Sequence, residues 1–175
     1  TLELAALWAV LTRLRRPDPK AFAEKDLAEA IAGLSPLDKA RLYDSGAVPD
    51  RLSSLVARQL KQATGVLAHW PGIDYEGAHG ASAREVRMLL MNASQSAERR
   101  CLSPLGLFAE IQNLVADKSV FSFLQRDPEG AYLDQEGILT ALRDHYLDLL
   151  EDEAAEAMGL ATHGSYQDLF DRYIQ

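Results

Sequence analysis

The chain has 175 residues, of which 47% are hydrophobic and 25% are charged, as is ordinary for a globular protein rather than a disordered one. Its net charge of −8 argues against broad binding to nucleic acid or to an anionic membrane surface. The single cysteine, Cys101, excludes an internal disulfide and fits a reducing, cytoplasmic compartment. No run approaches the roughly 20 apolar residues of a membrane span, and we expect no signal peptide, because the first segment contains Glu3 and continues as a helix.

Hydrophobic residues recur at helical spacing along the first half of the chain. An apolar stripe from Leu4 to Leu14 predicts the first helix, and residues 20–32, followed by Gly33, predict the second. Ser35 and Pro36 are typical of a helix start, so a third helix is expected from there to Gly46. A fourth is expected over residues 51–64, ended by Gly65, with its buried face formed by Leu52, Leu55, Val56 and Leu60. Residues 66–80 are expected to form a long loop.

The second half of the chain also has helical spacing. One helix is expected after Ser82, with Ala97 on its buried face, and another after Ser103. A short helical piece over residues 120–124 precedes a long helix capped by Asp134, which is expected to run to about residue 158 and to bury the apolar residues Ile138, Leu142, Tyr146, Leu149 and Leu150. A last helix is expected from about residue 165. No convincing β pattern occurs, so the sequence predicts an all-α fold.

The segment from Gly80 to Glu85 is the most informative motif for function. Ser82 is a candidate N-cap, and Glu85, three residues later, is placed to complete a capping box. Arg84 then lies in the first turn, where the helix dipole favours an anion and a guanidinium adds bidentate phosphate recognition. On its own the motif fits two interpretations of Arg84: an arginine that binds an anion such as phosphate, or a surface arginine in the first turn of a helix. We interpret Arg87, one turn later, as a surface residue.

The wider sequence resembles the PrkA family of AAA+ proteins, which are known as serine protein kinases. The similar segments are residues 1–14, 34–44, 80–84, 101–104 and 166–174. In AAA+ ATPases a Gly-x-Ser-x-Arg motif carries the second sensor arginine, which reaches from the lid domain to the bound nucleotide. The family usually has proline where this chain has Ala83, and residues 66–77 form a longer connection than expected. The resemblance implies that Arg84 senses the γ-phosphate of ATP.

The resemblance also implies a domain organisation. Residues 1–101 would be the end of the AAA+ core and a lid-like helical bundle, and residues 102–175 the start of a second, PrkA-type C-terminal helical unit. The full-length parent would use ATP and Mg²⁺, form a homo-oligomer and act on a protein substrate as a transferase. The lid would relay the state of ATP from the missing AAA+ core to the C-terminal helices. We expect the chain to be a piece of this longer protein.

The catalytic motifs of such a parent are missing from this sequence. It has no Gly-x-x-x-x-Gly-Lys-[Ser/Thr] phosphate cradle and none of the motifs of a protein-kinase catalytic core. We therefore expect the chain alone to be inactive, to have no catalytic residue and to need no cofactor.

The alternative interpretation is a helical protein-interaction or regulatory module with no nucleotide role. Carboxylates without an intervening lysine or arginine follow one another over residues 144–156, which predicts a negative helix face that is either solvated or bound to a basic partner. His69, His79, His145 and His163 are too dispersed to indicate a metal site. We interpret Cys101 as a buried cysteine at a helix junction.

Overall fold

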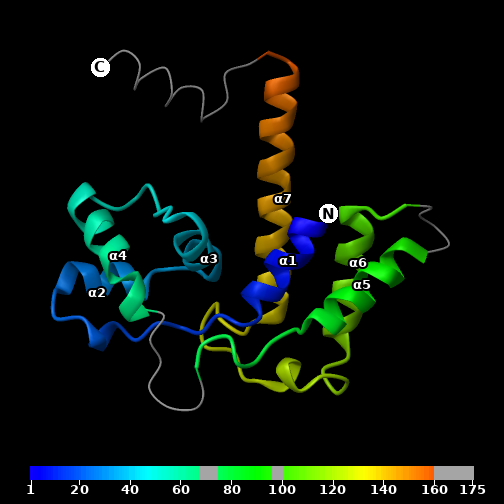
Figure 1. Ribbon diagram of the computed structural model, residues 1–175, viewed down its shortest axis with the longest axis horizontal. Helices are drawn as coiled ribbons and strands as arrows, with labels where there is room; N and C mark the ends of the chain where they lie inside the picture. The colour runs from blue at the N-terminus through cyan, green and yellow to red at the C-terminus, as the bar shows by residue number, and fades with distance from the viewer. Residues whose placement is uncertain (68–74, 96–100, 160–175) are drawn as a thin grey trace.

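The computed structural model describes residues 1–67, 75–95 and 101–159, and these residues form the all-α fold that the sequence predicts (Figure 1). Their helices are joined by loops, and no strand occurs in these ranges. The α-helices are α1 (Leu2–Leu11), α2 (Lys25–Ala32), α3 (Pro36–Ser45), α4 (Ser54–Leu67), α5 (Ala83–Gln95), α6 (Pro104–Ala116) and α7 (Gln135–Ala157), with short 3-10 helices at Pro19–Ala21 and Ser122–Gln125.

Local capping explains where several helices begin and end. At the start of α3 the Asp38 amide donates to Ser35 Oγ over 3.1 Å, and the Ser35 amide donates back to Asp38 Oδ2 over 3.2 Å. Gly46, with φ of +72°, ends this helix in the left-handed conformation that glycine adopts most readily. At the start of α6, Ser103 Oγ accepts the Gly106 amide over 3.1 Å. These predicted boundaries are confirmed.

The predicted boundaries of α2 and α4 are wrong. α2 begins at Lys25 rather than at residue 20, because a 3-10 turn at Pro19–Ala21 is followed by extended backbone at Phe22. α4 begins at Ser54 and continues through Gly65 to Leu67. Leu67 is buried, and burying a leucine outweighs the roughly 1 kcal/mol that a glycine costs inside a helix. The predicted helix near residue 165 and the position of Ala97 lie outside the described residues.

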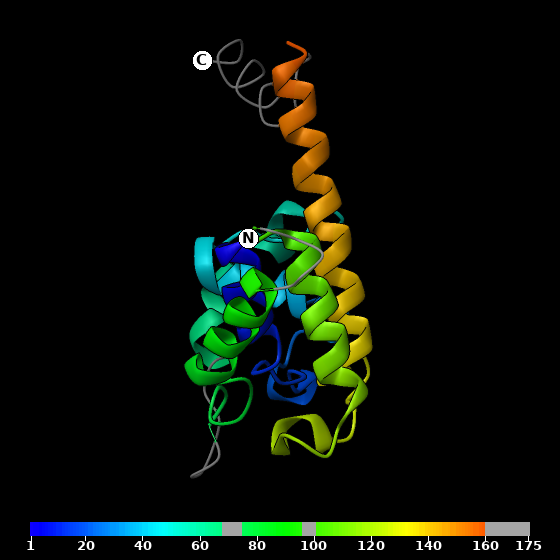
Figure 2. The same cartoon turned by 90° about the vertical axis from the view of Figure 1, so that its right-hand side faces the viewer.

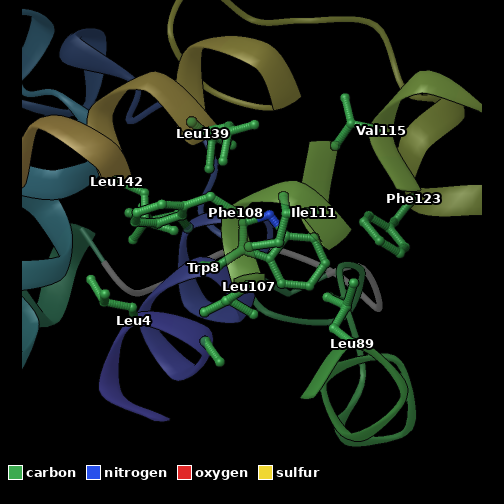
Figure 3. Packing of buried hydrophobic residues seen from close by; sticks show 14 of the residues in the cluster. Leu4, Trp8, Leu89, Leu107, Phe108, Ile111, Val115, Phe123, Leu139 and Leu142 are labelled. Carbon is green, nitrogen blue, oxygen red and sulfur yellow. The ribbon is translucent and has the colours of Figure 1, made fainter. Parts of the chain in front are cut away.

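Two hydrophobic clusters hold the helices together. The main core joins α1, α5, α6 and α7, with Trp8 fully buried and its ring edge-on to Phe123 at 6.2 Å (Figure 3). The small core joins α2, α3 and α4 around Ile31 and Leu60. α3 contributes to both cores, since Tyr43 packs against each of them. The main core takes residues from both sides of residue 101, and the domain division there stays a prediction.

The C-terminal half of α7 extends beyond the other described helices (Figures 1 and 2). Ile138 and Leu142 are buried, but Leu149 and Leu150 are each 40% exposed. The prediction that Leu149 and Leu150 are buried is therefore wrong, because α7 continues beyond the helices that cover its first half. Leu55 is also exposed, because it lies only one residue after the start of α4.

Candidate functional site

Arg84 lies exposed in the first turn of α5, as the sequence predicts. The Glu85 carboxylate accepts the backbone amide of Ser82 over 2.6 Å and also the Ser82 hydroxyl. The hydroxyl oxygen of Ser82 accepts the Arg84 amide over 3.3 Å, one residue earlier than a standard capping box would have it. Hydrogen bonding from Ser82 holds the pKa of Glu85 below its ordinary value, so this carboxylate is ionised near neutral pH. The helix start is thus fixed by its own residues, and Arg84 is exposed.

The segment just before Arg84 is attached to the end of α1. Arg13 donates from Nε and Nη2 to the Ala81 carbonyl, over 3.1 and 2.8 Å, and from Nη1 to the Gly77 carbonyl over 2.6 Å. The Ala81 amide in turn donates to Thr12 Oγ1 over 3.0 Å. The Arg13 guanidinium therefore binds two carbonyls of the loop, and the Thr12 hydroxyl accepts the amide of Ala81. These contacts set the position from which Arg84 projects.

Gly80 allows this close approach. Its φ is +141°, a conformation that other residues rarely adopt, and a Cβ there would lie 3.0 Å from the Thr12 carbonyl oxygen and would also meet the Arg13 side chain. The glycine of the Gly-x-Ser-x-Arg pattern therefore has a structural reason in this chain: it lets the loop backbone lie directly against α1.

A buried ion pair holds the same loop to α3. Lys39 Nζ lies 2.6 Å from Glu76 Oε1 and 2.8 Å from the Arg15 carbonyl oxygen, and both charged side chains are almost completely buried. Glu76 Oε1 also accepts the Arg15 amide over 2.8 Å, and Oε2 accepts the Tyr43 hydroxyl over 2.9 Å. Three donors thus converge on one carboxylate: two side chains of α3 and one backbone amide from the connection after α1. We call Lys39, Glu76, Tyr43 and the Arg15 backbone the Glu76 network.

The charges of this network follow from its burial. Burial lowers the pKa of Lys39, although the adjacent Glu76 carboxylate opposes the shift. Burial and the same carboxylate raise the pKa of Tyr43, so its phenol stays protonated and remains a hydrogen-bond donor. The Lys39 ammonium also lies 5.5 Å from the centre of the Tyr43 ring and 5.8 Å from that of Tyr132. Aromatic faces and a carboxylate together compensate a charge that water cannot reach.

Sequence reasoning missed the Glu76 network. One signal was present: Lys39 lies three and four residues before Leu42 and Tyr43, on the apolar side of a predicted helix. A lysine there needs a buried counter-ion, but nothing local indicates that Glu76, in a distant loop, supplies it.

The surface beside Arg84 is a shallow apolar groove of about 650 Å³ between α1 and α5, lined among others by Arg13, Arg87, Val86, Leu90 and Met91. Arg87 is exposed, in agreement with its interpretation as a surface residue. Arg84 itself does not line the groove but lies one turn from Arg87 on the same helix.

The remaining candidates are separate from this region. Cys101 is exposed, so its interpretation as a core cysteine is wrong. His145 Nδ1 lies 3.1 Å from a guanidinium nitrogen of Arg41, while His69 and His163 lie outside the described residues. Across residues 1–67, 75–95 and 101–159, no group of three histidine, cysteine, aspartate or glutamate side chains is arranged to hold a metal ion. In the same ranges no helix is long and apolar enough to cross a membrane.

These observations define an all-α fold in which an exposed arginine lies in the first turn of a helix, directly after a loop that is hydrogen-bonded to α3 and to the residues that follow α1. Comparison with protein families matches residues 37–175 to the PrkA serine protein kinase C-terminal domain, and the chain belongs to this family. The matched region begins in α3 and includes Arg84 and α7. Comparison with curated proteins and with solved structures finds no match.

Proposed function

We propose that this chain is the nucleotide-responsive part of a PrkA-like, ATP-dependent serine protein kinase, and that Arg84 contacts the γ-phosphate of ATP bound by an AAA+ core elsewhere in the same protein. The observation that carries the proposal is the presentation of Arg84: an exposed guanidinium in the first turn of a 13-residue helix, after a loop fixed by Arg13 and the Glu76 network. A preorganised cation of this kind binds an anion without first losing much side-chain and loop freedom.

The residues fit one contact to ATP rather than a complete nucleotide site. Ser82 already donates its amide and hydroxyl hydrogens to the Glu85 carboxylate at the start of the helix. The ionised carboxylate would repel a phosphate placed directly over it. A terminal phosphate would therefore contact the Arg84 side chain without lying directly over the Glu85 carboxylate at the N-terminus of α5. ATP and Mg²⁺ would be held by the parent's core, and the chain alone should show no micromolar ATP binding in calorimetry.

In this proposal the helices around Arg84 act as a lid. Binding of ATP would draw Arg84 towards the core, and the fixed loop would pass the displacement to α1 and α3. The parent would act as a homo-oligomer on a protein substrate. The hydrogen bonds of Arg13 and Glu76 support this role, because they join the Arg84 loop to both helices.

The test is ATPase and phosphotransfer assays on the full-length protein with Arg84→Ala, Arg84→Lys and, as a matched control, Arg58→Ala. Arg58 is an exposed arginine on α4, one of the three helices that form the small core. Losing one donor to the developing charge typically costs on the order of 10²-fold in rate, whereas an exposed arginine changes stability by about 0.5 kcal/mol or less. Lysine should rescue only part of the rate, because it keeps the charge but loses the bidentate geometry. Equal rates for Arg84→Ala and Arg58→Ala would exclude the sensor role.

The second candidate function is a helical interaction module without a nucleotide role. The observation that favours it is the unburied apolar surface on α7, where Leu149 and Leu150 remain 40% exposed on a helix that extends beyond its bundle. An interaction module would keep its partner binding in the Arg84→Ala protein and would show no change in ATP turnover.

A further inference from the structure

A second groove, of about 720 Å³, lies between α1, α3 and α7. Its apolar floor includes Leu7 and Val10 of α1 together with Leu149 and Leu150 of α7. Its charged lining includes the carboxylates Glu3, Asp44 and Glu153, one from each helix. Arg84 does not line this groove, so the inference below does not depend on the proposed nucleotide role.

The floor of the groove continues the buried stripe of α7. Tyr146, Leu149, Leu150 and Glu153 are spaced by three and four residues, so they share one helix face. The same face is buried at Leu142, where α1 and α6 cover the helix, and becomes exposed where α7 passes the end of the bundle (Figure 2). From Tyr146 to Glu153 the open stripe covers two helical turns, about 10 Å. An apolar stripe of this length is the usual docking face for one further helix.

The charge around the groove selects the chemistry of that helix. Between Asp144 and Met158, α7 carries six carboxylates and no lysine or arginine: Asp144, Asp148, Glu151, Asp152, Glu153 and Glu156. Arg41 of α3, which lines the groove, is hydrogen-bonded to His145 of α7, which also lines it. A second copy of the chain would bring an equally acidic α7 and a net charge of −8 against this surface. Nucleic acid and anionic lipid would be repelled in the same way.

We propose that the groove between α1, α3 and α7 binds an amphipathic, basic helix of a separate protein. Two turns of apolar side chains on the partner lie on Leu7, Leu149 and Leu150. Lysine or arginine side chains flanking that stripe face the carboxylates of Glu3, Asp44 and Glu153. Apolar burial provides the affinity, and the acidic rim provides orientation and a fast, salt-dependent association.

The test uses the 175-residue chain and a synthetic Leu/Lys peptide of about 18 residues with leucine at helical spacing. A peptide of the same composition with scrambled order is the control for charge alone. Fluorescence anisotropy should show saturable binding of the amphipathic peptide, and affinity should fall at high salt because the exposed charges are screened. Circular dichroism should show the peptide gaining helix on binding.

Variants on α7 locate the binding face. Leu149→Ala combined with Leu150→Ala should weaken binding about tenfold or more, since each change removes apolar area from the contact. Leu147→Ala is the matched control: it is 60% exposed on the same helix but lines a different depression, with Leu105 and Phe108. Glu153→Lys should weaken binding about fivefold at low salt, whereas Asp127→Lys, in an exposed loop, makes the same change of net charge with little effect.

Three results would overturn the proposal. The first is equal binding of the amphipathic and scrambled peptides, which would reduce the effect to net charge. The second is an equal loss of affinity for Leu147→Ala and for the Leu149/Leu150 double variant. The third is sedimentation equilibrium showing a dimer that Leu150→Glu dissociates, because the occupant would then be a second copy.

Discussion

Replacing Glu76 by glutamine should destabilise the chain by about 3 kcal/mol, because it leaves the buried Lys39 ammonium without its carboxylate. Lys39 is fully buried, and its other acceptor is a single backbone carbonyl 2.8 Å away. Removing one partner of a buried ion pair typically costs 3–5 kcal/mol, and we take about the lower end because the glutamine oxygen still accepts one hydrogen bond. For a chain of this size the loss corresponds to a fall in Tm of about 6–12 °C.

The assay is urea unfolding followed by circular dichroism, with the free energy of unfolding extrapolated to water. The control is Glu29→Gln, which makes the same chemical change in an exposed pair, where Lys25 Nζ lies 3.8 Å from Glu29 Oε1. Such a surface pair is worth about 0.5 kcal/mol or less. If both variants lose the same free energy, the Glu76 network does not hold the loop. Adding Lys39→Met to Glu76→Gln should restore part of the loss, because the uncompensated charge is then gone.

Three further predictions concern glycine and histidine. Gly80→Ala should cost about 2 kcal/mol or more in urea unfolding, because its φ of +141° and the nearby Thr12 carbonyl leave no place for a Cβ. Gly65→Ala should instead stabilise α4 by about 0.5–1 kcal/mol, since a Cβ there meets nothing within 4 Å; a lower Tm would contradict the assigned helix. Burial and the Arg41 guanidinium lower the pKa of His145, so the unfolded chain binds this proton more readily and stability should fall as the pH drops through about 6.5. In an NMR titration Arg41→Ala should raise the pKa of His145, and an unchanged value would refute the assigned cause.

Sequence reasoning located the features that depend on neighbours in the chain. The capping residues Ser35 and Ser103 and the first-turn placement of Arg84 are confirmed, because a cap is formed within three or four residues. Boundaries failed where distant packing decides them. Leu67 continues α4 past Gly65 because the small core buries it, and no local pattern contains that information.

The support of the candidate site is also a product of distant contacts. Arg13 and Gly77 are separated by 64 positions, and Lys39 and Glu76 by 37. A buried charge on a helix signals only that a partner exists. The partner's identity follows from the loop geometry, which the sequence does not specify on its own. For the same reason the open groove on α7 was not predicted: the stripe from Ile138 to Leu150 is continuous, and the sequence does not show where the covering helices end.

α1 is the element that the two proposed sites share. Thr12 and Arg13, the two residues directly after it, hydrogen-bond to the loop before Arg84, while Leu7 and Val10 of α1 form part of the floor of the groove on α7. Trp8, between them, is fully buried in the main core, so α1 is packed to move as a unit rather than to bend. Any displacement of the Arg84 loop that shifts α1 therefore changes the groove as well. Because coupling between two binding sites is reciprocal, a helix bound in the groove would in turn bias the position of Arg84.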